Sequence, residues 1–253
     1  SPDGRLYQVE YAREAVKRGT ASIGVRTPEG VVLAVDKRIR SPLMERSSVE
    51  KIHKADDHIG IASAGHVADA RQLIDYARQH AQINELRYGE AIGVETLTKE
   101  VTDYIQQYTQ VGGARPFGVA LIIAGVENGV PRLYETDPSG TPYEWQALAI
   151  GADRNDIRSY LEEHYDEDMS LDEGVALALA ALASVNDDTL SPESIGVATI
   201  AVEDPVLTEL SEDEKTTYLD EEGLLAEEDA DDEDDESDAE DADDEGDADD
   251  SDE

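Results

Sequence analysis

The sequence predicts an α+β domain, built as a four-layer α/β/β/α sandwich. Alternating strand patterns occur in neighbouring pairs separated by turn residues, which indicates β-hairpins. Two groups of helical patterns, each long enough for two helices, interrupt these strands, and a single strand follows the second group. Two antiparallel sheets packed face to face, with two helices on each outer face, would bury the apolar stripes in this order. The spacing favours one large domain over residues 1–220.

The first segment combines a turn and a helix. Pro2 fixes the first corner of a reverse turn at residues 1–4, and Gly4 tolerates its exit. A helix follows, because apolar residues recur three or four positions apart on one side, and Gly19 ends it. The apolar stripe consists of Leu6, Val9, Ala12 and Val16.

The next elements are two hairpins and two helices. Strand patterns cover 20–26 and 31–37, then 50–54 and 58–63. From Gly65 the period becomes helical and stays so until Tyr88-Gly89, and a second helix covers about 94–110. The inward face of the first helix is predicted as Val67, Ala70, Ile74, Ala77 and Ala81, and that of the second as Leu97, Val101, Tyr104, Ile105 and Tyr108.

The second half repeats this arrangement. The turn sequences Asn128-Gly129 and Asp137-Pro138-Ser139-Gly140 separate three strand patterns, which lie at 117–125, 131–136 and 142–150. Helices are predicted at about 154–164 and 170–186, and a strand at 195–202.

Charge is the second strong signal. Residues 221–253 hold 22 of the 61 acidic residues and none of the 20 basic ones, so residues 1–220 keep 39 acids against 20 bases, a net charge of −19. The tail 221–253 has almost no large apolar side chain, and we expect it to be disordered. The acidic body indicates a salt-adapted protein, because salt near 1 M shortens the Debye length to about 3 Å and relieves self-repulsion.

The composition argues against several function classes. A body this acidic would repel nucleic acid, and the longest apolar run, Val119 to Gly125, is too short for a membrane span. The chain has no Cys, so disulfides, thiolate metal sites and a Cys nucleophile are excluded. No cofactor or metal-binding motif is found among the five His residues. We expect a cytoplasmic protein without cofactor or metal.

Five sequence blocks, in an order that few families share, suggest a relationship. They are SPDGRLYQVEYAREAVKRGTASIGV at 1–25, DKRIRSPL at 36–43, SVEKIHKADDHIGIASAGHVADAR at 48–71, QQYTQVGGARPFGVALIIAG at 106–125 and RLYETDPSGTPYEW at 132–145. Together they resemble the α-type subunits of the 20S proteasome core particle of archaea, and the acidic body suggests a halophile. The resemblance covers roughly residues 1 to 220 and implies the N-terminal-nucleophile hydrolase fold.

The resemblance also implies a function and partners. Proteasome α-type subunits form a seven-membered outer ring, stack on a ring of β-type subunits, gate the entry of protein substrates and dock an activating AAA ATPase, without cutting peptide bonds themselves. We therefore expect a homo-heptameric α ring in intracellular protein degradation. Family members carry a gate-forming segment before the opening turn, so we expect this chain to be truncated at its N-terminus.

Site residues are carried over from the same family. Lys51 is the lysine expected to receive the C-terminal carboxylate of the ATPase, and Gly4 and Glu10 are expected to line that pocket. Pro2 and Tyr11 are expected to support the gate turn. The ordinary alternatives are a solvated lysine at a strand end for Lys51 and a helix-packing aromatic for Tyr11.

A peptidase of the same fold is the main alternative. In the related β-type subunits a threonine freed by cleavage after glycine is the nucleophile, and Gly19-Thr20 imitates that junction. Asp36 has the family's separation from Thr20, and Lys51 lies one residue short of the expected lysine. However, Thr20 lies in mid-chain, where its nitrogen is an amide and not a base, so we predict no catalytic residue. A third alternative is a free-standing scaffold or holdase.

Overall fold

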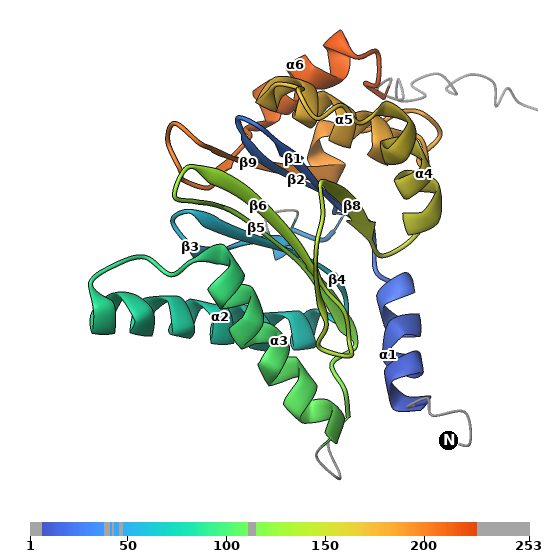
Figure 1. The fold of residues 1–253 in the computed structure, drawn as a ribbon. Coiled ribbons are helices and arrows are strands. Elements are labelled where there is room, and N and C mark those ends of the chain that lie inside the picture. The colour runs from blue at the N-terminus through green and yellow to red at the C-terminus, as the bar shows by residue number, and fades with distance from the viewer. Residues whose placement is uncertain (1–6, 38–40, 42, 46–47, 111–114, 227–253) are drawn as a thin grey trace, which may run out of the picture.

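The computed structural model describes residues 7–37, 41, 43–45, 48–110 and 115–226, and these form the predicted sandwich (Figure 1). Two five-stranded sheets lie face to face, with strand orders β10-β9-β2-β1-β8 and β3-β4-β5-β6-β7. Neighbouring strands within each sheet are antiparallel. The first sheet comprises β1 (Ser22–Thr27), β2 (Gly30–Asp36), β8 (Ala147–Ile150), β9 (Ile195–Ala201) and β10 (Thr208–Glu209). The second comprises β3 (Ile52–Asp56), β4 (Ile59–Gly65), β5 (Val119–Glu127), β6 (Val130–Thr136) and β7 (Pro142–Glu144).

Helices cover both outer faces of the sandwich. Helices α2 (Val67–Tyr88) and α3 (Val94–Gln110) lie on the second sheet, and α4 (Arg154–His164) and α5 (Leu171–Ala183) lie on the first (Figure 1). Each helix pair shares an apolar cluster with its sheet, and a third cluster fills the space between the sheets. The predicted four-layer α/β/β/α fold is thereby confirmed. None of the helices in the described residues is both long and apolar enough for a bilayer span.

Helix α1 (Tyr7–Lys17) lies beside the sandwich, at the end of β4 and the start of β5 (Figure 1). Its predicted stripe is confirmed for Val9, Ala12 and Val16, which are buried, whereas Leu6 lies outside the described residues. Val16 belongs to the cluster between the sheets, so the end of α1 closes that core on one side.

The predicted strand 142–150 is wrong as a single element. It divides at Trp145 into β7 and β8, which belong to different sheets. Trp145 N still donates to Leu133 O of β6, whereas Ala147 already pairs with Val25 of β1. The chain therefore crosses from one sheet to the other within two residues, and the alternating pattern gives no sign of it.

The predicted inward face of α2 needs one correction. Val67 is 72% exposed, whereas Asp69 is buried, at 6%. Val67 occupies the first turn of the helix, where it points away from the sheet. Asp69 takes the inward place because its carboxylate accepts hydrogen bonds from Arg115 and from the backbone of Gly118.

The chain remains folded beyond the predicted boundary at residue 220. Helix α6 (Glu212–Glu221) begins at a capping box in which Ser211 and Glu214 bond each other's backbone N–H groups. The ammonium of Lys215 is buried and donates to Pro192 O at 2.5 Å and Ile195 O at 3.2 Å. Beyond the helix, Leu224 and Leu225 pack against the core of the first sheet. Residues 221–226, which were predicted to belong to the tail, are therefore part of the fold, and residues 227–253 lie outside the described part.

Candidate functional site

The junction between α1 and β1 is the candidate site, because the residues of both catalytic and docking hypotheses meet there. After α1, Gly19 N donates to Val16 O at 3.0 Å, and Gly19 O accepts from Ala152 N at 2.8 Å. A Cβ at position 19 would lie 2.3 Å from the backbone nitrogen of Gly65. The junction is therefore packed backbone to backbone against the end of β4.

The hydroxyl of Thr20 is fixed on both sides. Thr20 Oγ1 donates to Asp36 O at 2.8 Å and accepts from Lys51 Nζ at 2.5 Å. Its proton is therefore directed at a carbonyl oxygen, which is not a base.

The ammonium of Lys51 connects the start of β3 with the start of β1 and the end of β2. Besides Thr20 Oγ1, it donates to three backbone oxygens, those of Thr20 at 3.0 Å, Ala21 at 3.1 Å and Asp36 at 3.0 Å. Lys51 lies directly before β3, whereas its acceptors lie at the start of β1 and the end of β2. One partly buried side chain thus links both sheets. The alternative for Lys51 was a lysine at a strand end whose ammonium is solvated by water.

The structure brings together all three residues of the peptidase alternative. Thr20, Asp36 and Lys51 converge although their spacing differs by one residue from that expected. However, neither of the two described groups that bond Thr20 Oγ1 is a base. Among the described groups that bond Thr20 Oγ1, one is an ammonium that donates and the other a carbonyl, and the nitrogen of Thr20 is an amide in mid-chain. The geometry suits a structural junction better than an activated nucleophile.

The other predicted site residues lie on α1 or outside the described part. Glu10 accepts from Arg13 Nη1 at 2.8 Å on the same helix. Tyr11 is 76% exposed, so it does not pack within the subunit. Pro2 and Gly4 fall outside the described residues.

An ion pair that was not predicted from the sequence fastens α1 to the body. Arg13 Nη2 donates to Asp137 Oδ2 at 2.9 Å. Asp137 is held in place by Ser139 and Thr141, whose backbone N–H groups donate to Oδ1 at 3.0 and 3.2 Å. The Ser139 hydroxyl also donates to Oδ1, at 2.5 Å. Burial is the largest single influence on the pKa of Asp137 and would raise it, but the Ser139 hydroxyl, Arg13 and the Thr141 N–H together lower it. The predicted turn at 137–140 was the only local signal, since Arg13 lies 124 residues away.

A second contact that was not predicted stabilises the start of α2. Arg115 donates to both oxygens of Asp69 at 2.7 Å, and Gly118 N donates to Asp69 Oδ2 at 2.8 Å. Burial is the largest influence on the pKa of Asp69 and would raise it, but these hydrogen bonds together lower it. An acidic residue on the apolar face of a predicted helix was the available signal.

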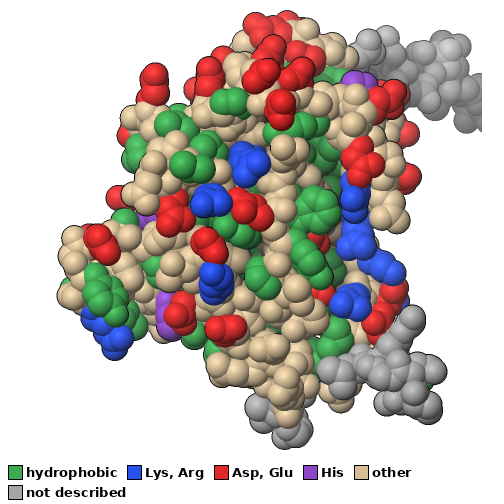
Figure 2. All heavy atoms as spheres, viewed as in Figure 1, with side chains coloured by type: hydrophobic (Ala, Val, Ile, Leu, Met, Phe, Trp, Pro, Cys, Tyr) green, Lys and Arg blue, Asp and Glu red, His purple; other side chains and the backbone are tan. Residues whose placement is uncertain are grey.

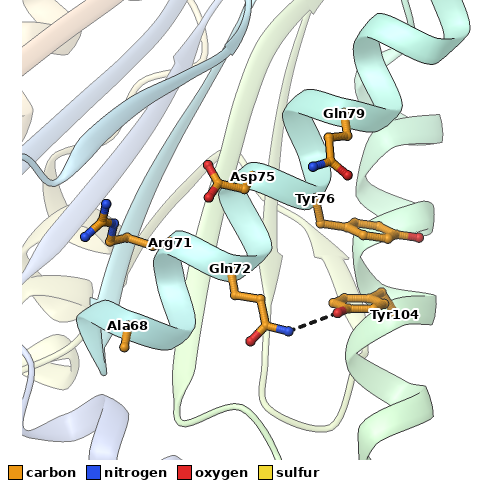
Figure 3. A pocket seen from close by; sticks show the side chains of 7 residues that line it. All are labelled: Ala68, Arg71, Gln72, Asp75, Tyr76, Gln79 and Tyr104. Carbon is orange, nitrogen blue, oxygen red and sulfur yellow. Dashed lines mark hydrogen bonds between the residues drawn. The ribbon is translucent and has the colours of Figure 1, made fainter.

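A shallow groove of about 560 Å³ lies between α2 and α3, away from the predicted site residues (Figure 3). Its floor is formed by Tyr76 and Tyr104, whose rings stack at a centroid distance of 4.1 Å and an interplanar angle of 10°. Gln72 donates to Tyr104 OH at 3.0 Å across the groove. The groove contains none of the residues proposed for catalysis or docking.

Comparison with known proteins decides the family. Residues 16–200 match the family model described as proteasome subunit, and residues 1–15 match the N-terminal signature of A-type proteasome subunits. The chain belongs to the proteasome family, as one of its α-type subunits. The sequence resemblance is thereby confirmed.

Similar proteasome subunits come from halophilic archaea. The chain is 81% identical over 232 residues to the alpha 1 proteasome subunit of Haloarcula marismortui, covering 91% of this chain and 89% of the relative. It is 76% identical over 233 residues to the alpha proteasome subunit of Natronomonas pharaonis, covering 91% of each. Haloarcula marismortui also has an alpha 2 proteasome subunit, 66% identical over 228 residues, covering 90% of this chain and 93% of the relative. These sources agree with the salt adaptation predicted from composition.

Proposed function

We propose that this α-type proteasome subunit is non-catalytic: it forms the outer ring, gates the entry of protein substrates and docks an activating ATPase, while a β-type ring cuts peptide bonds. The observation that carries the non-catalytic role is the position of Thr20, in mid-chain behind a helix packed on the body. A threonine hydroxyl needs a nearby base, which this fold would supply only as a free terminal amine.

Removing residues 1–19 would be costly, which supports a permanent α1. It would expose the core surface that Val9, Ala12 and Val16 cover, and burial of such side chains contributes roughly 25 cal/mol per Å². It would also leave Asp137 without its Arg13 partner.

Purified protein alone is expected to retain residues 1–19 and to hydrolyse neither casein nor a fluorogenic peptide. Intact mass measurement and peptidase assays check this, and the same chain assembled on a β-type ring is the positive control.

The convergence of Thr20, Asp36 and Lys51 makes a threonine endopeptidase the second candidate. A chain beginning at Thr20 whose activity is abolished by Thr20→Ala would establish that candidate instead.

Lys51 is proposed as the acceptor of the ATPase's terminal carboxylate, with Gly4 and Glu10 lining the pocket and Pro2 and Tyr11 supporting the gate turn. A charge-assisted hydrogen bond to an ammonium in a partly enclosed site is stronger than a surface ion pair. Because Lys51 already donates to four oxygens, an incoming carboxylate has to share or displace some of these contacts.

Replacing Lys51 by methionine is expected to abolish ATPase-stimulated protein degradation while rings still form. It should also lower the free energy of unfolding by about 1–3 kcal/mol, because carbonyl oxygens lose their donor. Lys54→Met is the matched control, since that side chain is half exposed and pairs with Asp57 at the surface. Degradation rates and thermal melts are the measurements.

A second variant separates docking from stability. Thr20→Val removes Oγ1 but keeps the ammonium, so it should lower stability without loss of docking. If both variants lose docking equally, or if Lys51→Met keeps it, Lys51 is not the carboxylate acceptor. The scaffold alternative predicts that co-expression with a β-type partner gives no stacked particle in negative-stain images.

A further inference from the structure

Two opposite sides of the sandwich are formed by the outermost strands of the sheets. Strands β7 and β8 are the outer strands on one side and are joined through Trp145, whereas β3 and β10 are the outer strands on the other. All three residues of β7 are exposed. Unpaired outer strands leave backbone donors and acceptors free for another chain, and proteins usually cover them.

The side at β7 and β8 is rich in arginine; we call it the arginine edge and define it by Arg26, Arg132, Tyr143, Trp145, Arg154 and Arg158. Arg132 and Arg26 share one carboxylate, that of Glu144, at 3.0 and 3.4 Å. Arg158 lies over the ring of Trp145, 5.0 Å from its centroid. Figure 2 shows Lys and Arg side chains gathered in a column between α4 and α1 on this side.

The opposite side carries mainly acidic residues; we call it the acidic edge. Asp57 lies in the turn after β3, and Leu207 N, just before β10, donates to its backbone oxygen at 2.8 Å, so the two strand ends lie side by side. Val206 is 40% exposed beside them. The carboxylates of this edge are Asp56, Asp57, Glu203, Asp204 and Glu209, and the ammonium of Lys54 in β3 pairs with Asp57.

The arginine edge differs in charge from the folded body as a whole. Residues 1–220 have about two acidic residues for each basic one, 39 against 20. On the arginine edge, four arginines face three carboxylates, Glu144, Glu162 of the Arg158 pair and Glu135, whose carboxyl lies near Arg154 and Arg158. Two copies of so acidic a protein repel each other least where this edge is involved. Arginine and aromatic residues are also those enriched at the centres of protein interfaces.

We propose that the arginine edge of one copy binds the acidic edge of a second copy, head to tail. A two-fold symmetric contact would place the four arginines of one edge against those of the other, so like charges disfavour self-pairing. When two copies bind through different edges, one copy keeps a free acidic edge and the other a free arginine edge. Further copies can therefore add, and the result is a closed ring or an open filament. This inference rests on the proposed ring and names the surfaces that close it.

The test is charge reversal in the full chain, measured by sedimentation and native mass spectrometry in about 1 M KCl, where only ion pairs in direct contact persist. Wild type should form rings. Arg154→Glu with Arg158→Glu should give monomers, and so should Asp204→Arg with Glu209→Arg. All four changes in one chain should restore rings. Arg71→Glu with Arg87→Glu, both exposed on α2, is the control of equal charge and should leave the rings unchanged.

The results of this test distinguish failure of the proposed edge contact from failure of the proposed ring. Rings formed by either reversed pair, or no recovery in the fourfold variant, would overturn the edge contact while leaving the ring itself intact. A wild type that is monomeric or a closed dimer would overturn both.

Photo-cross-linking tests the edge contact without any reversed charge. The chain has no cysteine, so Tyr143→Cys offers a single thiol for a benzophenone label. Irradiated rings should yield cross-links to the peptides around 52–58 or 202–210 of a second copy. Cross-links confined to other regions, or none between copies, would overturn the proposal.

Discussion

An alanine at position 19 is expected to prevent formation of a stable subunit. Its Cβ would lie 2.3 Å from Gly65 N and 3.1 Å from the carbonyl carbon of Ala64, and both belong to backbone that cannot rotate away. Gly65 cannot retreat either, since it has a φ of 121° and its own Cβ position lies 2.3 Å from Gly118 O. A displacement would therefore spread through β4 into β5, at a cost of about 3 kcal/mol or more.

Soluble yield and thermal melts of Gly19→Ala measure this effect, with Gly89→Ala as the matched control. Gly89, unlike Gly19, has a positive φ, of 71°, but no atom lies within 4 Å of its Cβ position, so only backbone strain of about 1–2 kcal/mol is added. A Gly19→Ala protein that melts above the control would refute the packing argument. The glycine before Thr20 is thus explained by close packing, without any cleavage at this bond.

Asp69→Asn is expected to lower the free energy of unfolding by about 2–3 kcal/mol at neutral pH. The carboxylate accepts three hydrogen bonds, two from Arg115 and one from Gly118 N. An amide offers one acceptor atom and would point its NH₂ group at a donor. Since the Arg115 side chain is 64% exposed, water can solvate the guanidinium after the change, which limits the loss.

The pH dependence supplies an independent check. The pKa of Asp69 is lowered in the folded protein, so its ionised form contributes stability above the unfolded pKa of about 3.9. That contribution is lost as the pH falls through the folded pKa. Melts should therefore show a difference between wild type and Asp69→Asn that is full at pH 7 and shrinks below about pH 4.

Asp75→Asn on the same helix is the control, because Asp75 is exposed and pairs only loosely with Arg78, at 3.5 Å. It should change stability by less than about 0.5 kcal/mol. Equal losses in the two variants, or a loss for Asp69→Asn that does not depend on pH, would contradict the proposed role of the buried carboxylate.

The local pattern was sufficient for most elements. The helix at 154–164 and the helix at 94–110 have the observed limits, because apolar residues at helical spacing also pack against a sheet in the structure. The capping box of Ser211 and Glu214 is a local sequence signal for the start of α6. The strand 142–150 could not be divided from sequence, because the chain changes sheets while the alternation of side chains continues.

At the junction between α1 and β1, some properties of single residues follow from the sequence, and others follow only from the tertiary structure. The sequence alone established that Thr20 lies in mid-chain, so its nitrogen is an amide, and that α1 precedes it with an apolar stripe to bury. Only the tertiary structure placed Lys51 Nζ 2.5 Å from Thr20 Oγ1, joined Arg13 to Asp137 and put arginines and carboxylates on opposite edges. Periodicity reports which face of an element is buried. It carries no information on groups that meet although 30 to 124 residues separate them in the sequence, because such contacts depend on how the sheets pack.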